Sequence, residues 1–132
     1  MKLAAQRVNR LALLSFAGLA AACGSASAQS TWINPVDGNW SDASKWSAGV
    51  PNGIAAIINQ PGVYNIAFNG NYSIPSLTQS VPGVTISIGD NLTYSMSGGM
   101  SNDGTIGVNT GAGANASYIR LVNGPQTIDG TA

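Results

Sequence analysis

Short runs of alternating apolar and polar residues recur along most of this chain. In Tyr64–Phe68 and Val84–Ile88 every second residue is large and apolar, which is the pattern of a strand with one buried face. Gly, Asn, Asp or Pro separates most of the runs, and no apolar stripe with helical spacing persists after Ala28. The predicted strands are 54–59, 63–68, 72–77, 84–88, 92–96, 105–108, 118–122 and 127–128.

The dipeptide Thr-Ile forms an internal repeat. It occurs at Thr85-Ile86, Thr105-Ile106 and Thr127-Ile128, and each copy lies beside a turn rich in Gly, Asn or Pro. The similar steps between the copies fit one coil of a β-solenoid, whose coils stack about 4.8 Å apart. The predicted fold is therefore all-β, a parallel β-helix or solenoid in which these isoleucines stack. An evenly spaced β-sandwich is the alternative.

Residues 29–53 form a distinct opening to the predicted solenoid. They contain all three tryptophans, Trp32, Trp40 and Trp46, among turn-forming residues. We interpret this segment as an irregular Trp-rich cap on the first coil, because aromatic side chains bury a large area at the end of a stack. Residues 54–132 are the predicted solenoid coils.

Residues 1–28 have the pattern of a bacterial signal peptide. A basic start is followed by the uncharged and mostly apolar stretch 11–22, which is shorter than a membrane span, and by the cleavage pattern Ala26-Ser27-Ala28. We therefore expect cleavage after Ala28, export of the chain, and no stable membrane span in the mature protein. Residues 19–23 also loosely match a lipoprotein box, which leaves lipidation of Cys23 as a less favoured alternative.

The composition of residues 29–132 excludes several function classes. Two basic residues stand against five aspartates, a formal charge of −3, and without a basic patch nucleic acid is not an expected partner. His and Glu are absent and Cys23 is the only cysteine, so the mature chain has no disulfide or thiolate chemistry. We predict no cofactor, no metal and no enzymatic activity.

The opening segment resembles that of a family of large exported bacterial proteins. The spacing of Trp32, Gly38-Asn39-Trp40, Trp46 and Gly49-Val50-Pro51 is similar to the element that follows the signal peptide in planctomycete-type secreted proteins with autotransporter-associated β-strand repeats, and in their sorting-signal-bearing relatives. Residues 102–106 and 127–130 are similar to the Asn, Gly, Thr and Ile residues that recur in each of those repeats.

This resemblance covers residues 29–132 and implies a right-handed parallel β-helix stalk, at the cell surface or outside the cell, with a structural or adhesive role. It implies no catalytic residues. The chain departs from the family in having neither an outer-membrane barrel nor a C-terminal sorting signal. We therefore expect the N-terminal portion of an incomplete solenoid, whose open last coil favours self-association.

Three groups of side chains are candidate sites. Trp40 and Trp46 would form a flat platform for a glycan if they were exposed, whereas burial would make them part of the cap; replacing Trp46 by Ala separates the two hypotheses. A second group, Asp37, Asn39 and Asp42, offers oxygen ligands of the kind that calcium prefers. Their spacing does not match an EF-hand loop, and Asx turns explain them equally well.

Asp90 and Asp103 are the third group, a candidate acid and base pair of the kind used by glycan-cleaving β-helices. Turn positions are the favoured role, because both aspartates lie in Gly- and Asn-rich turns. The sequence thus predicts a non-enzymatic, exported, structural or adhesin-like solenoid, with surface polysaccharide or a sister chain as partner. The alternatives are a glycan-binding module and the N-terminal part of a polysaccharide-degrading β-helix enzyme.

Overall fold

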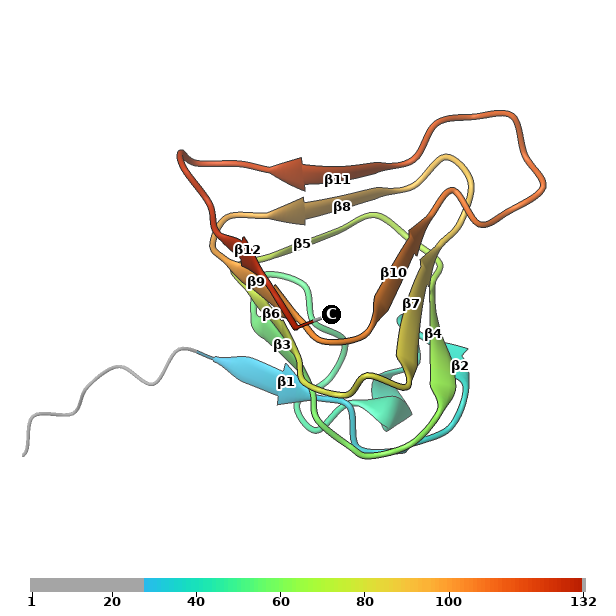
Figure 1. Ribbon diagram of the computed structural model, residues 1–132, viewed down its shortest axis with the longest axis vertical. Helices are drawn as coiled ribbons and strands as arrows, with labels where there is room; N and C mark the ends of the chain where they lie inside the picture. The colour runs from blue at the N-terminus through green and yellow to red at the C-terminus, as the bar shows by residue number, and fades with distance from the viewer. Residues whose placement is uncertain (1–27, 132) are drawn as a thin grey trace, which may run out of the picture.

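The computed structural model describes residues 28–131, so Cys23 and the predicted signal peptide, apart from Ala28, lie outside the described residues. Three sheets form the three sides of a stack that encloses one core (Figure 1). All nine pairs of neighbouring strands are parallel. The predicted β-solenoid is confirmed, with about 4 turns, and the sandwich alternative, which requires antiparallel sheets, is wrong.

Successive strands along the chain pass from one side of the stack to the next. The five-stranded sheet has the order β1 (Gln29–Thr31), β3 (Ala55–Ile58), β6 (Leu77–Gln79), β9 (Met100–Asn102) and β12 (Ile128–Asp129). The four-stranded sheet consists of β2 (Gly38–Asn39), β4 (Tyr64–Phe68), β7 (Val84–Ile88) and β10 (Thr105–Val108). The three-stranded sheet consists of β5 (Tyr72–Ile74), β8 (Thr93–Met96) and β11 (Tyr118–Leu121). A short 3-10 helix, η1 (Ala43–Lys45), lies between β2 and β3.

A column of isoleucines runs through the four-stranded sheet. Ile66 of β4 pairs with Ile86 of β7, which pairs with Ile106 of β10, so successive turns place the same residue type at the same inward position. Ile66 and Ile86 are fully buried. Complete burial of a side chain of this size contributes about 1.5–3 kcal/mol. The step between the first two Thr-Ile copies is confirmed as one turn of the solenoid, because Thr85 also pairs with Thr105.

The third Thr-Ile copy does not continue this column. Ile128 pairs with Met100 in the five-stranded sheet, so the expected stacking of Ile128 on Ile106 is wrong. Met100 in turn pairs with Leu77, and the stretch from Met100 to Ile128 is longer than the stretch from Leu77 to Met100. The connection between β10 and β11 is long, so the last turn contains more residues than the earlier turns. A Thr-Ile copy at a similar spacing along the sequence therefore lies on a different side of the stack.

The strand boundaries follow the predicted runs, with two kinds of error. The run 72–77 is two strands, β5 and β6, on different sides of the stack. Pro75 lies at the corner between them, where its missing N–H removes a ladder donor. The strands β1, β2 and β9 were not predicted, because runs of two or three residues are too short to show alternation.

Gly104 lies at a corner where the backbone of one turn passes close to the next. A methyl group on Gly104 would overlap the backbone carbonyl oxygen of Val84 and the side-chain amide of Gln79. Gln79 is fully buried, and its Nε2 donates to the Val84 oxygen at 2.7 Å, so neither neighbour is free to move away. Only glycine therefore fits between these two turns.

We expect Gly104→Ala to lower the free energy of unfolding by about 1–3 kcal/mol, because the methyl group forces two packed turns apart. Urea unfolding followed by circular dichroism measures the change. Gly89→Ala is the matched control, since its methyl group would meet Leu92 at an ordinary 3.5 Å. Equal stabilities of the two variants would contradict the close packing at Gly104.

Candidate functional site

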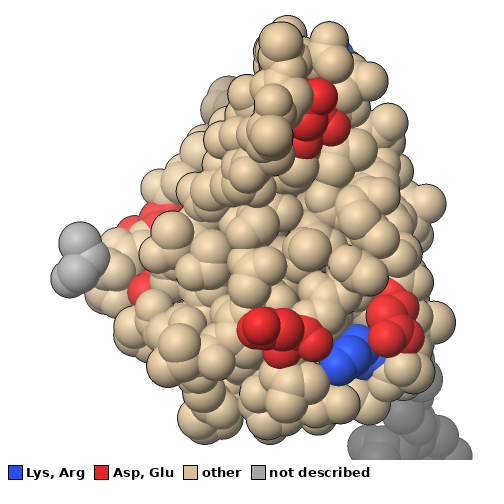
Figure 2. All heavy atoms as spheres, turned by 90° about the vertical axis from the view of Figure 1, so that its right-hand side faces the viewer, with Lys and Arg blue, Asp and Glu red and all other residues tan. Residues whose placement is uncertain are grey.

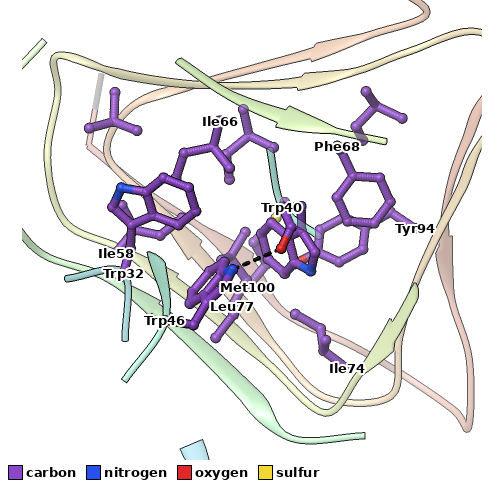
Figure 3. Close-up of a cluster of buried hydrophobic side chains, with 14 of the residues drawn as sticks. Trp32, Trp40, Trp46, Ile58, Ile66, Phe68, Ile74, Leu77, Tyr94 and Met100 are labelled. Atoms are coloured by element: carbon purple, nitrogen blue, oxygen red, sulfur yellow. Dashed lines mark hydrogen bonds between the residues drawn. The ribbon is translucent and has the colours of Figure 1, made fainter. Parts of the chain in front are cut away.

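The three tryptophans close the N-terminal end of the core. Trp32 and Trp40 have 0% of their surface exposed and Trp46 has 3%. Trp46 packs edge-on between the other two, with ring centroids 5.1 Å from Trp32 and 4.8 Å from Trp40 (Figure 3). Its Nε1 donates to the Trp40 carbonyl oxygen at 2.9 Å. A buried ring cannot stack on a sugar, so the glycan platform at Trp40 and Trp46 is wrong and the two residues form part of the cap.

The tryptophan cluster continues into the aromatic core of the following turns. Trp40 contacts Phe68 at a centroid distance of 5.1 Å and Tyr94 at 5.6 Å, and its Nε1 donates to the Pro51 carbonyl oxygen at 3.2 Å. Burial raises the pKa of the Tyr94 phenol well above its usual value. The cluster thus joins the first turn to the third, which gives these aromatic residues a role in stability.

A loop after η1 covers the outer edge of β1. The Thr31 carbonyl oxygen accepts from the Ser47 backbone N–H at 2.9 Å. The Thr31 backbone N–H donates to the Ser47 hydroxyl, also at 2.9 Å. The Ser30 hydroxyl accepts from the Ala48 N–H at 3.1 Å and donates to the Gly49 oxygen at 2.7 Å. The predicted cap, 29–53, is therefore more ordered than expected, since it contains β1 and β2 of the first turn and the loop that closes their end.

The candidate calcium ligands have separate structural partners. Asp37 accepts from the Asn65 backbone N–H at 2.7 Å, which ties the first turn to the second. Asp42 caps η1 by accepting from the Ser44 N–H at 3.0 Å and from its hydroxyl at 2.6 Å. These hydrogen bonds from Ser44 lower the pKa of the Asp42 carboxyl. Asn39 lies exposed on β2. The bond to the next turn accounts for Asp37, and capping of η1 accounts for Asp42.

The candidate acid and base, Asp90 and Asp103, lie at different corners of the stack. Asp90 is in the turn from β7 to β8 and accepts from the Asn115 N–H at 2.9 Å, which holds the long loop before β11. Asp103 is in the turn from β9 to β10 and accepts from the Thr131 N–H at 3.0 Å and its hydroxyl at 2.9 Å. Hydrogen bonds from Thr131 lower the pKa of Asp103. The structure does not bring the two carboxylates together.

The end of the stack opposite the tryptophans is hollow. A cavity of about 510 Å³ opens between the last strands, and its apolar lining comes from Met100, Ile106, Ile119 and Ile128. Ile128 is 57% exposed and Leu121 is 41% exposed, although their partners one turn earlier, Met100 and Met96, are buried. The hollow could not be predicted from the sequence, because it is made by residues from three different sheets.

The outer face of the four-stranded sheet is broad and free of charge at its centre. In Figure 2, which shows this side of the stack, acidic and basic side chains lie only toward the margins. Asn65, Thr85 and Thr105 are in register across three strands and alternate with the buried positions, so their polar side chains face outward. Sequence analysis missed this surface, although its uncharged alternate positions were visible in the strand pattern.

Residues 28–131 contain neither a metal-ligand cluster nor a membrane-spanning helix. No group of three or more His, Cys, Asp or Glu side chains suited to a metal ion occurs in the described part of the chain. Within the same range, no helix has the length and apolar character needed to cross a membrane. No family model, curated protein or solved structure matches the chain.

We expect Trp46→Ala to lower the free energy of unfolding by about 3–5 kcal/mol, because it leaves a cavity between two other tryptophans. Chemical unfolding followed by tryptophan fluorescence and circular dichroism measures the loss. Val63→Ala is the control: Val63 is 90% exposed, and its replacement should change stability by less than about 0.5 kcal/mol. A Trp46→Ala protein of unchanged stability would contradict the cap.

Proposed function

We propose that this chain is a non-enzymatic, exported bacterial β-solenoid with a structural or adhesin-like role at the cell surface or outside the cell. The observation that carries the proposal is the continuous stack of in-register turns around one core. Such a stack is a rigid rod whose stability comes from contacts between neighbouring turns, and its outer faces are available for contact with other surfaces.

Polar side chains at the corners support a mechanical role. Asn71 accepts from the Thr93 N–H of the next turn at 2.7 Å, and Asn52 accepts from the Ser73 N–H at 3.3 Å. Asp37 and Asp103 make the same kind of bond from one turn to the next. Because backbone groups at the corners are bonded across turns, opening one turn breaks contacts with both neighbours. A protein of this kind resists proteolysis.

Export rests on the sequence of residues 1–28, and the place of the chain among proteins with autotransporter-associated β-strand repeats rests on its Trp element. The Ala28 carbonyl oxygen accepts from the Ala55 N–H at 3.0 Å, and cleavage after Ala28 would remove that bond.

The test of this proposal is to express the whole chain in a bacterium, to fractionate the cells, and to determine the mass of the product. We expect an exported protein that begins at Gln29 and whose residues from β1 onward resist protease. A product retained in the cytoplasm with residues 1–28 intact would refute export. A lipid-sized mass increase on Cys23 would instead establish the lipoprotein alternative.

A glycan-binding module is the second candidate, favoured by the uncharged outer face of the four-stranded sheet. Hydroxyl and amide groups such as those of Asn65, Thr85 and Thr105 suit hydrogen bonding to a neutral polysaccharide. On a glycan array a plain stalk should bind nothing specifically, whereas a module should bind and should lose binding in Thr105→Asp. Thr78→Asp, an exposed change on the five-stranded sheet, is the control. Binding that survives Thr105→Asp would place the site elsewhere.

A further inference from the structure

Two columns of outward side chains run along the four-stranded sheet, parallel to the axis of the stack. The first column is polar and uncharged on three successive turns, and it consists of Asn65, Thr85 and Thr105. The second column holds only small residues, which are Ala67, Ser87 and Gly107. The Thr110 methyl carbon lies 2.7 Å from the place of a side-chain carbon on Gly107, so it levels the column there. A polar column thus lies beside a low, flat one.

Neither of the other two sides of the stack repeats one uncharged pattern in this way within residues 28–131. The outward column of the five-stranded sheet contains both Ile57 and Asp129. On the three-stranded sheet, the basic Arg120 follows Ser95 in the outward column. The four-stranded sheet is therefore the side that presents similar neutral groups once per turn, and charged side chains lie only toward its margins (Figure 2).

The spacing of the two columns defines the kind of ligand that fits them. Each column repeats at the distance between neighbouring strands, about 4.8 Å, and the columns lie two residues apart along each strand, about 6.6 Å. A matching ligand is uncharged, straight over several turns, and repeats at nearly one strand spacing. We propose that this face binds a neutral, extended β-1,4-linked polysaccharide, which lies parallel to the axis with one sugar ring on each turn. The inference rests on the glycan-binding candidate above and names its ligand.

The chemistry of such a chain suits both columns. In β-1,4-linked polymers of glucose or N-acetylglucosamine the linkages and ring substituents are equatorial, so the flat faces carry C–H groups and the edges carry hydroxyl groups. A C–H face then rests on the small column at Ala67 and Ser87, where no long side chain holds it away. The edge hydroxyls meet Thr85 and Thr105, whose own hydroxyls both donate and accept. Ser87 donates to Asn65 Oδ1, which leaves the amide nitrogen of Asn65 as a further donor.

The test is titration calorimetry of the full chain with soluble β-1,4-linked oligosaccharides of glucose and of N-acetylglucosamine, in a series of increasing length. We expect the affinity to rise with each added ring until the rings cover the turns that carry both columns, and then to level off. Ala67→Leu raises the low column and should weaken binding about tenfold or more. Thr85→Val removes one hydroxyl at nearly constant shape and should weaken binding about threefold to tenfold.

Matched controls make the same replacements on another side of the stack. Ala55→Leu and Thr78→Val change outward positions of the five-stranded sheet and should leave binding unchanged. Circular dichroism of all four variants establishes that each is folded. If the control variants weakened binding as much as Ala67→Leu and Thr85→Val do, the assignment to the four-stranded sheet would be overturned.

The remaining outcomes separate this inference from the proposed function. Curved α-1,4-linked oligosaccharides of glucose that bind as tightly as the β-1,4-linked series would overturn the ligand class and leave the glycan-binding candidate standing. No binding to any oligosaccharide would overturn both, whereas a plain exported stalk would remain. Self-association of the wild-type chain that Ala67→Leu abolishes would also overturn the inference, because a second copy would then cover the face.

Discussion

The fold depends on one constraint: no single turn of the chain can bury its own apolar side. Each turn has two or three short strands, and their inward side chains are covered only by the corresponding side chains of the turns before and after. Ile66, Ile86 and Ile106 satisfy this constraint in the simplest way, by repeating one shape at one position. Parallel in-register pairing on all three sides follows, because only that pairing keeps every inward position in line.

A stack built in this way has two ends, and each end exposes apolar surface and unpaired backbone groups. The first turn solves the problem within the chain, by folding a loop across β1 and packing Trp40 and Trp46 beneath it. The last turn has no equivalent loop among the described residues, and its inward apolar side chains line an open cavity. The two ends of the described stack therefore differ in how far their apolar side chains are covered.

The polar residues of the chain serve the same stack. Short Asp and Asn side chains at the corners accept hydrogen bonds from the backbone of the neighbouring turn, as Asp37 and Asn71 do. Backbone N–H groups at a corner point away from the sheet ladders and need such partners. Aspartates in a turn-rich solenoid are therefore weak indicators of catalysis or metal binding, and the separation of Asp90 from Asp103 illustrates this.

Period and alternation in the sequence were sufficient to establish an all-β stack, the approximate length of its turns and most of its strands, because inward positions must repeat locally. The same local signals failed wherever the outcome depended on the whole turn. Ile128 joined a different sheet because the connection after β10 is long, and the run 72–77 split at the Pro75 corner. The burial of Trp40 and Trp46, the separation of Asp90 and Asp103, and the hollow end were decided only by the tertiary structure, since each depends on contacts between residues distant in sequence.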